Sequence, residues 1–250
     1  MFNEYSEASF DELSTLSNFD KNIIPVGEIA FVTKALEKLG YNKENIMKPI
    51  EIPDILLDKQ NKDKISFINR EYHIVTYNEA LELFDRETNW KAKKWFVKCA
   101  TVLKSMDAHP MFKKEFISRA KLIDNYEQQL YVMSEPVNII AEYRVLVCND
   151  TYVDNVEYIG YYNGKDRLAF PDSNTIRTMI NKIQYARDIL KQKLPKSYTL
   201  DIAVHTNYDD SKYKTSIIEM HNFVSYGTYG YDGNSLLRMY RLGIEFEKSM

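Results

Sequence analysis

Two acidic residues, Asp201 and Glu219, are spaced so that a hairpin could hold a metal ion between them. They lie in two apolar segments, YTLDIAVHT and KTSIIEMHN, which the polar segment NYDDSKY separates. If the turn is centred on Asp210, the two acids face each other across antiparallel strands. Like charges about 5 Å apart are destabilising unless a cation separates them. Mg²⁺ suits this position, because it takes a few carboxylate oxygen atoms and leaves other positions for water and phosphate.

The alternation of side chains along the second segment adds His221 to the face of Glu219. Asn222 points to the other face as long as the strand continues. The alternative is a solvated surface on which the acids oppose nearby lysine residues, since facing acids also occur on exposed sheets. For a metal site, we expect the double change Asp201→Asn with Glu219→Gln to abolish metal-dependent ligand binding. Without metal, stability should stay equal or rise by the roughly 0.2 to 1 kcal/mol of a like-charge pair.

Three basic residues have side chains suited to phosphate. Lys98 ends the apolar run WFVK, Lys104 opens a loop six residues later, and each offers a compact charge. Arg144 lies within the apolar segment IIAEYRVLV, and its planar guanidinium can hold two oxygen atoms at once. The alternative for Arg144 is a structural pair with Glu142, because buried charges need partners. The glycine-rich segment SYGTYGYDG could approach a ligand closely, but it lacks the spacing of the common phosphate-binding loops.

The elements that must position these residues are both helices and strands. Helical spacing of apolar residues predicts helices over residues 27–40, about 79–86, about 110–129, from 172 or 173 to before 195, and from about 235 onward. Segments rich in Val, Ile and Tyr, or with period-two alternation, predict strands over residues 93–105, 129–150 with a break at Glu135-Pro136, and 157–164. The final strands are those of the acidic hairpin.

The composition is that of an ordinary globular protein. The chain has 250 residues, 44% of them hydrophobic and 28% charged, and a formal charge of −3. This charge offers no support for a nucleic-acid partner. Cys99 and Cys148 each end an apolar run and are interpreted as reduced core thiols. No segment has the roughly 18 apolar residues of a membrane span, and the acidic start MFNEYSEASFDELS differs from a signal peptide, so we expect a cytoplasmic protein without a membrane partner.

In order along the chain, the segments WFVKCATVLKS, VMSEPV, AEYRVLV, LDIAV and SIIEMHNFVSYGTYG resemble the ATP-grasp superfamily. More narrowly, they resemble its divergent clade named for one arginine and two lysines. The resemblance covers roughly residues 23–233 and rests on order and spacing. It implies an α+β fold in which two lobes, with mostly antiparallel sheets and flanking helices, grip ATP. The implied division is a pre-grasp lobe over 1–90 and an ATP-grasp region over 91–250, with a small lobe at about 91–135 and a large lobe at about 136–250.

The resemblance implies roles for the basic residues and for the segment between the lobes. Lys98 and Lys104 would contact nucleotide phosphates, and Arg144 would meet the terminal phosphate. Lys104 and Arg144 are therefore the candidate catalytic residues. The segment from Met133 to Val137 would hold the adenine edge through backbone groups, with Glu135 nearby.

The resemblance also implies that Asp201 and Glu219 bind Mg²⁺, in agreement with the hairpin. The clade's usual acid-x-Asn appears here as Glu219-Met220-His221, with Asn222 one place late. Either His221 replaces the amide ligand, or a bulge brings Asn222 inward. Imidazole is a poorer Mg²⁺ ligand than oxygen, so Mn²⁺ is an alternative metal. The clade's usual Phe-Gly after the second lysine is replaced by SMDAHP, so the loop over the phosphates is expected to differ.

The function implied by the resemblance is that of an ATP-dependent carboxylate-amine ligase. Such an enzyme phosphorylates a carboxylate and lets an amine displace the phosphate, and a peptide or protein is the candidate substrate here. Catalysis would rest on positioning and on cations that neutralise the transferred phosphoryl group. The alternative is an ATP-binding assembly chaperone, like the eukaryotic member of the clade, which assembles a translation initiation factor. A domain with a vestigial site is the third hypothesis.

Overall fold

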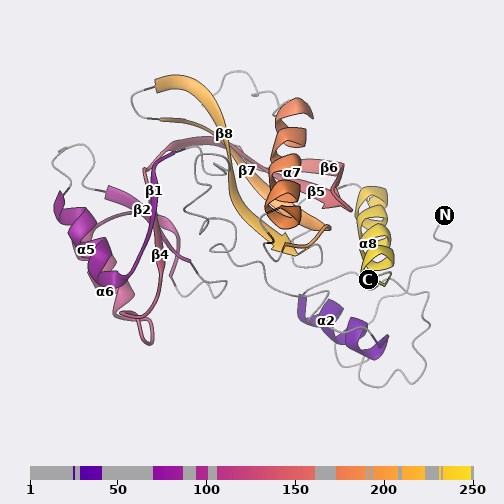
Figure 1. The fold of residues 1–250 in the computed structure, drawn as a ribbon, viewed down its shortest axis with the longest axis horizontal. Helices are drawn as coiled ribbons and strands as arrows, with labels where there is room; N and C mark the ends of the chain where they lie inside the picture. The colour runs from indigo at the N-terminus through magenta and orange to yellow at the C-terminus, as the bar shows by residue number, and fades with distance from the viewer. Residues whose placement is uncertain are drawn as a thin grey trace.

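The computed structural model describes the main elements of two lobes. Described are residues 25, 29–40, 70–86, 94–100, 106–160, 173–189, 191, 194–207, 210–222, 231 and 233–248. Two four-stranded antiparallel sheets form the centres of the lobes, and helices flank both sheets (Figure 1). The α+β fold predicted from the sequence is confirmed.

The small lobe is built on a sheet with strand order β1-β4-β2-β3. Its strands are β1 (Tyr72–Val75), β2 (Lys94–Cys99), β3 (His109–Phe112) and β4 (Tyr131–Ser134), and its helices are α5 (Tyr77–Arg86) and α6 (Lys113–Ala120). The β2 residues Trp95, Val97 and Cys99 pack with apolar residues of both helices in one core cluster. This period-two burial confirms the predicted strand and leaves Lys98 on the opposite face.

Helix α5 begins with a capping box. The backbone N–H of Thr76 donates to Glu79 Oε2 at 2.8 Å, and the backbone N–H of Glu79 donates to Thr76 Oγ1 at 3.5 Å. These two bonds satisfy donors that a helix start would otherwise leave without partners. The helix therefore starts directly after β1 and covers the small-lobe sheet.

The large lobe is built on a sheet with strand order β6-β5-β7-β8. Its strands are β5 (Asn138–Cys148), β6 (Thr151–Gly160), β7 (Tyr198–Asn207) and β8 (Asp210–Asn222), and the helices beside it are α2 (Ile29–Lys38), α7 (Ser173–Asp188) and α8 (Gly233–Lys248). Helix α7 packs on the face that carries Val145, Leu200 and Met220. Residues of α2 and α8 pack with Leu146 and Cys148, which belong to the opposite face. The two faces of this sheet thus have different neighbours.

The two lobes are in direct contact. Tyr72, Ala100 and Val132 of the small lobe belong to the same core cluster as Ile217 and Met220 of the large lobe. The connection between the lobes is short, because β4 ends at residue 134 and β5 begins at residue 138. Strand β1 and helix α5, which precede the boundary predicted at residue 90, share the sheet and core of β2 to β4. The division at that boundary stays a prediction.

Most predicted elements are confirmed, but β1 and β3 were not predicted, and β6 begins at Thr151 instead of residue 157. One predicted helix is much shorter than expected. The helix expected over about 110–129 begins only at Lys113 and ends at Ala120. Pro110 lies instead in β3, opposite Phe96, and Asn125 has a φ of 55° that belongs to a turn. Among the described strands, β3 is an edge strand of its sheet. An edge position tolerates a proline, which has no backbone N–H. The turn predicted at residues 163–164 lies outside the described residues.

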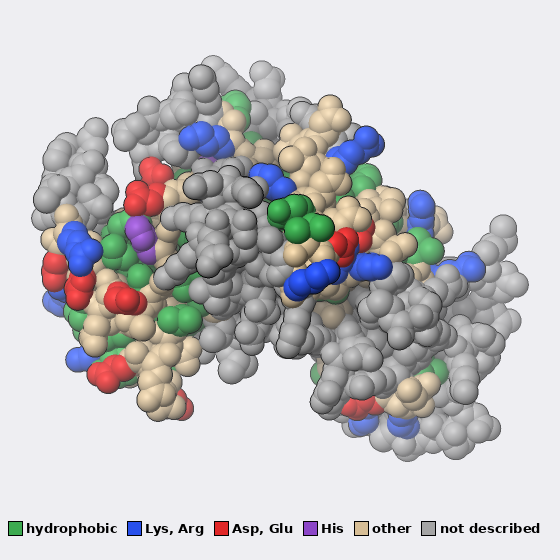
Figure 2. Space-filling model, viewed as in Figure 1, with side chains coloured by type: hydrophobic (Ala, Val, Ile, Leu, Met, Phe, Trp, Pro, Cys, Tyr) green, Lys and Arg blue, Asp and Glu red, His purple; other side chains and the backbone are tan. Residues whose placement is uncertain are grey.

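Charged side chains of both signs are distributed over the surface. On the face shown in Figure 2, basic and acidic side chains of the described residues are interspersed over both lobes. This distribution agrees with the nearly balanced composition of 33 basic and 36 acidic residues. Among the described helices, none is long and apolar enough to cross a membrane. Cys99 and Cys148 are buried free thiols, as predicted.

Candidate functional site

The acidic residues of the hairpin are direct cross-strand partners. Asp201 pairs with Glu219, as the sequence predicted. The assumed turn was wrong, because Asn207 pairs with Asp210 and β8 therefore begins four residues before the predicted segment. Register shifts between Asp201 and Ile202, and between His205 and Asn207, restore the pairing. The correct pair thus results from an earlier turn combined with bulges, which the sequence pattern did not reveal.

His221 joins the two acids on one face of the hairpin formed by β7 and β8. Its Nε2 atom lies 3.3 Å from Asp201 Oδ2 and 3.1 Å from Glu219 Oε2. One ligand atom from each of the three residues can be chosen so that all lie within 4.8 Å of one another. The structure therefore brings together three of the predicted metal ligands. The fourth, Asn222, is the last residue of β8, and alternation places it on the face of Met220, which packs in the core with α7.

Arg144 forms a buried pair with Asp201. The guanidinium donates from Nε to Asp201 Oδ1 and from Nη2 to Oδ2, each at 2.6 Å. The side chains are only 7% and 4% exposed, and the two residues are also partners across β5 and β7. The structural alternative named Glu142 as the partner of Arg144, whereas the structure pairs the guanidinium with Asp201 on the neighbouring strand.

The ion pair of Arg144 and Asp201 changes the stability that we expect for the variant Asp201→Asn with Glu219→Gln. The sequence suggested that removing the charges of Asp201 and Glu219 would relieve a like-charge repulsion. In the structure, Asp201 already has Arg144 and His221 as hydrogen-bond partners. Removing its charge would leave a buried guanidinium without this counter-ion, which is strongly unfavourable. We therefore expect a loss of stability instead of a small gain.

The same contacts shift the proton affinities of the cluster. Burial would raise the pKa of Asp201, but hydrogen bonds from Arg144 and His221 outweigh it and the pKa is lowered. Burial would lower the pKa of His221, but hydrogen bonds with Asp201 and Glu219 outweigh it and the pKa is raised. The lowered pKa keeps Asp201 ionised at neutral pH.

A tyrosine before α8 supports the strand that carries Arg144. The Tyr231 hydroxyl donates to the backbone carbonyl of Arg144 at 2.6 Å, and the ring packs in the core with α2 and α8 residues. Tyr231 belongs to the glycine-rich segment SYGTYGYDG, for which the sequence suggested a ligand contact. Of its glycine residues, Gly227 and Gly230 lie outside the described residues. The part that is described has a structural role.

Lys98 connects the small lobe to the acidic hairpin. Its side chain is 9% exposed, and Nζ donates to the backbone carbonyl of Ile218 at 2.9 Å. Ile218 precedes Glu219, so the ammonium group lies beside the strand that carries two of the candidate ligands. Lys104, the second predicted lysine, lies outside the described residues, and its role stays a prediction.

The segment between the lobes has its backbone partly engaged. Met133 is fully buried in β4 and pairs with residues of both β1 and β2. The backbone N–H of Glu135 donates to the carbonyl of Glu71 at 3.0 Å, and Val137 is half-buried. Adenine contacts through the N–H groups of Met133 or Glu135 would have to replace these bonds. The predicted adenine contact of this segment stays a prediction.

Two polar residues between the lobes were missed from the sequence. Arg70 donates from Nε to Ser134 Oγ at 3.1 Å, and burial lowers its pKa to about 10 although Glu135 acts against the shift. His205 lies on β7, four residues after Asp201 on the same face, and hydrogen-bonds to Ser216. Burial, then the charges of Arg70 and Lys214, lower the pKa of His205 to about 4. The polar His205 within the apolar run DIAVH was the available signal.

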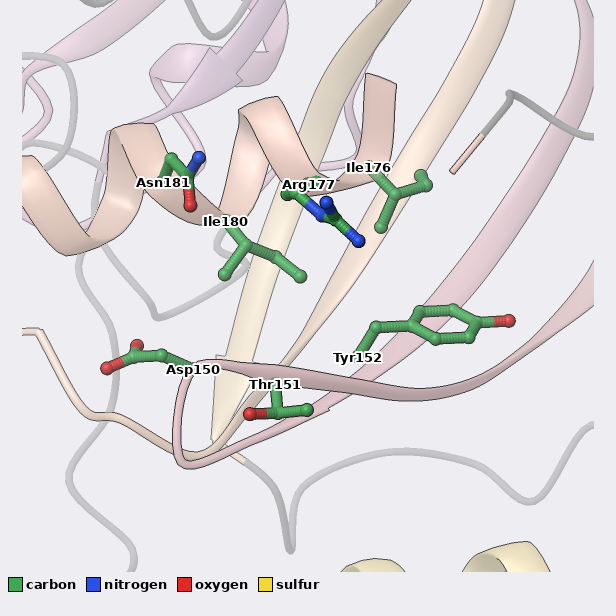
Figure 3. A pocket seen from close by; sticks show the side chains of 7 residues that line it. All are labelled: Asp150, Thr151, Tyr152, Ile176, Arg177, Ile180 and Asn181. Carbon is green, nitrogen blue, oxygen red and sulfur yellow. The ribbon is translucent and has the colours of Figure 1, made fainter. Parts of the chain in front are cut away.

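A cavity of about 450 Å³ lies on the other face of the large-lobe sheet. The α7 side chains Ile176, Arg177 and Ile180 point toward Thr151 and Tyr152 of β6 (Figure 3). Tyr152 pairs with Val147, whose side chain is on the α7 face. The cavity is therefore separated from the carboxylate cluster by the sheet.

Comparisons with known proteins agree with this fold. Residues 67–239 match a family model for an ATP-grasp domain, the second family of the clade named for one arginine and two lysines. Among solved structures, the RimK domain ATP-grasp protein from Sphaerobacter thermophilus DSM 20745 has a TM-score of 0.51 at 12% identity, covering 86% of this chain and 76% of that protein. At this identity the likeness shows a shared fold. A search of curated protein sequences finds no match.

Two further structures are similar at lower TM-scores. For the D-alanine-D-alanine ligase from Coxiella burnetii the TM-score is 0.47 at 15% identity, with 87% of this chain and 60% of that one covered. For the macrocyclase MdnC from Microcystis aeruginosa MRC, bound with its precursor peptide MdnA, the TM-score is 0.48 at 12% identity, with 75% and 59% covered. This chain spans less than two thirds of the length of either protein. The family model matches more than half of the chain, and the chain therefore belongs to the second family of ATP-grasp domains in the one-arginine, two-lysine clade.

Proposed function

We propose that this protein is a metal- and ATP-dependent ligase that joins a carboxylate to an amine. The observation that carries the proposal is the cluster of Arg144, Asp201, Glu219 and His221, with Lys98 beside it from the other lobe. Cations and carboxylates gather here, and Lys98 of the small lobe donates to the carbonyl of Ile218, the residue before Glu219. A nucleoside triphosphate with its divalent ion requires both kinds of group.

The proposed reaction has two steps. A substrate carboxylate oxygen atom attacks the terminal phosphorus of ATP, and the bond to the bridging oxygen breaks to release ADP. An amine nitrogen then attacks the acyl phosphate carbon, and phosphate leaves with formation of the amide bond. The reaction consumes one carboxylate, one amine and one ATP, and yields amide, ADP and phosphate.

The residues of the site would act mainly through charge and position. Asp201, Glu219 and His221 would hold the divalent cation, which supplies charge neutralisation to the phosphates when bound. Their donor set of two carboxylates and an imidazole fits such an ion. Arg144 and Lys98 would neutralise negative charge on the nucleotide, and the buried surroundings of Arg144 would strengthen that effect. A peptide or protein is the proposed substrate class.

Release of ADP tests the proposal. The full chain would be incubated with ATP, Mg²⁺ or Mn²⁺, and a mixture of peptides and amino acids, and ADP would be measured by a coupled assay. The proposal predicts release that depends on the added substrate and is strongly reduced in Arg144→Lys, since a point charge cannot reproduce a two-pronged clamp. The exposed Arg177→Lys variant on α7 is the matched control. Stable ATP binding without ADP release would favour the assembly chaperone instead.

A further inference from the structure

Two distances within the carboxylate and imidazole cluster resemble those between adjacent ligands of one octahedral ion. Donor atoms about 2.1 Å from a shared ion lie about 3.0 Å apart when adjacent and about 4.2 Å apart when opposite. The distances from His221 Nε2 to the two carboxylate oxygen atoms are 3.3 and 3.1 Å. These values fit an imidazole adjacent to both oxygen atoms. Each of the three residues can offer one ligand atom within 4.8 Å of the others, so the two carboxylates are close enough to share one ion with the imidazole.

The backbone fixes the imidazole at this place. His221 pairs with Thr199 on β7, and Asp201 and Glu219 form the next pair on the same face. Asp201 is 4% exposed at the floor of the cluster, whereas Glu219 and His221 are 22% and 21% exposed. An ion can therefore approach from the side of the two less buried ligands.

The charges of the cluster suit an ion that arrives with phosphate. Two carboxylates and the guanidinium of Arg144 carry a net charge of −1 when the imidazole is neutral. A divalent ion changes this to +1, which attracts a polyphosphate. Because Arg144 already neutralises part of Asp201, we expect the protein alone to bind the ion weakly and the nucleotide to complete its coordination.

The imidazole distinguishes between ions of similar size and charge. Mg²⁺ prefers oxygen ligands, whereas imidazole binds first-row transition metals more readily. The remaining donors are carboxylate and phosphate oxygen atoms, which suit Mg²⁺ and Mn²⁺. Of Mg²⁺ and Mn²⁺, only Mn²⁺ is a transition metal, and it accepts the imidazole more readily.

We propose that His221 coordinates the metal through Nε2 and that the site consequently selects Mn²⁺ over Mg²⁺. This inference rests on the proposed nucleotide site, but concerns the identity of its metal. It differs from a role in which His221 only holds the two carboxylates by hydrogen bonds. In that role, an asparagine at position 221 would leave the choice of metal unchanged.

Metal titrations of His221→Asn test the selectivity. The full chain, His221→Asn and the control His109→Asn would be titrated with Mn²⁺ and with Mg²⁺ in the presence of a non-hydrolysable ATP analogue, by calorimetry. The ratio of Mn²⁺ to Mg²⁺ affinity should fall on the order of tenfold or more in His221→Asn, the loss typical of a perturbed metal shell. It should be unchanged in His109→Asn, because His109 bonds Glu115 in the small lobe. An equal ratio in all three proteins overturns the proposal.

Electron spin-echo spectroscopy of bound Mn²⁺ tests the coordination itself. The wild type should show coupling of Mn²⁺ to a ¹⁴N nucleus, with and without the nucleotide analogue, and His221→Asn should lose it. Bound Mn²⁺ without such coupling in the wild type overturns the inference even if nucleotide binding is normal. Absence of nucleotide binding with either ion, together with ¹⁴N coupling, would contradict the proposed function and still support the metal ligand.

Discussion

Arg144 and Asp201 form a buried ion pair whose two bonds are both 2.6 Å long. Asp201→Asn should lower the free energy of unfolding by about 3 kcal/mol, because it leaves the guanidinium without its counter-ion. Glu219→Gln is the matched control, since its side chain is 22% exposed, and should change stability by no more than about 0.5 kcal/mol. Denaturant unfolding without metal measures both values. Equal stability of Asp201→Asn and wild type would show that the pair contributes little.

His205 should make stability sensitive to pH. Its pKa is about 4 in the folded protein, against about 6.5 in an unfolded chain, mainly because the ring is buried. Between these values the unfolded chain binds more protons, so stability should fall as the pH decreases from about 6.5 to about 4. Denaturant midpoints at pH 7 and 5 should differ less in His205→Gln than in wild type. His73→Gln, at a partly exposed position, should keep the wild-type difference. An equal fall in the denaturant midpoint from pH 7 to pH 5 in wild type and both variants would contradict this account.

At the residue scale, the sequence predicted residue types better than their partners. The face shared by Asp201, Glu219 and His221 could be read from alternation, because period two is fixed by strand geometry. The partner of Arg144 could not be predicted in this way, because the pairing of β5 with β7 joins segments 57 residues apart. The position of His205 was missed for the same reason, since its burial depends on neighbours from several strands.

Helix α7 is anchored to the turn between β5 and β6. Arg187 donates from Nη1 and Nη2 to the two carboxylate oxygen atoms of Asp150, at 2.8 and 2.6 Å, and both side chains are nearly buried. Asn149 and Asp150 have φ values of 46° and 57°, which a two-residue hairpin turn requires. The ion pair therefore fixes the turn and the end of the helix together.

Loss of this anchor should cost stability without affecting the site. Arg187→Ala should lower the free energy of unfolding by about 3 kcal/mol, because Asp150 loses its counter-ion. Metal-dependent nucleotide binding should persist, since α7 covers the sheet face opposite the carboxylates. Arg177→Ala, exposed on the same helix, should change stability by no more than about 0.5 kcal/mol. Loss of nucleotide binding in folded Arg187→Ala would refute the separation of the two faces.

At the scale of elements, strong periodicity was sufficient to predict the helices. It was not sufficient to predict the register between strands. The helices α2, α5, α7 and α8 and the break between β4 and β5 follow from local patterns. The extent of α6 was misjudged, because Pro110 was taken as a helix start and belongs to an edge strand. The turn between β7 and β8 was misplaced, because polar residues near its end form strand pairs such as Asn207 with Asp210. Pairing depends on both strands and is only partly encoded in either.

At the scale of the molecule, Lys98 links the small lobe to β8. Lys98→Met keeps the apolar stem but removes the charge and the bond to Ile218. Nucleotide affinity should fall by about 1.5 to 3 kcal/mol, the contribution of a hydrogen bond to a charged group. Lys94→Met is the matched control, because Lys94 lies four residues before Lys98 on the same face of β2. This variant should bind the nucleotide with wild-type affinity. Calorimetry with an ATP analogue compares them, and equal affinity for Lys98→Met and Lys94→Met would exclude Lys98 from the site.

The central claim is that the cluster of Asp201, Glu219 and His221 holds a divalent ion together with ATP. Calorimetric titration of the full chain with a non-hydrolysable ATP analogue, with Mg²⁺ or with a chelator, tests it most directly. The account predicts binding that requires the metal and disappears in the Asp201→Asn, Glu219→Gln double variant, provided that circular dichroism shows the variant folded. Equal affinity with metal and with chelator, or undiminished binding by the folded double variant, would contradict it.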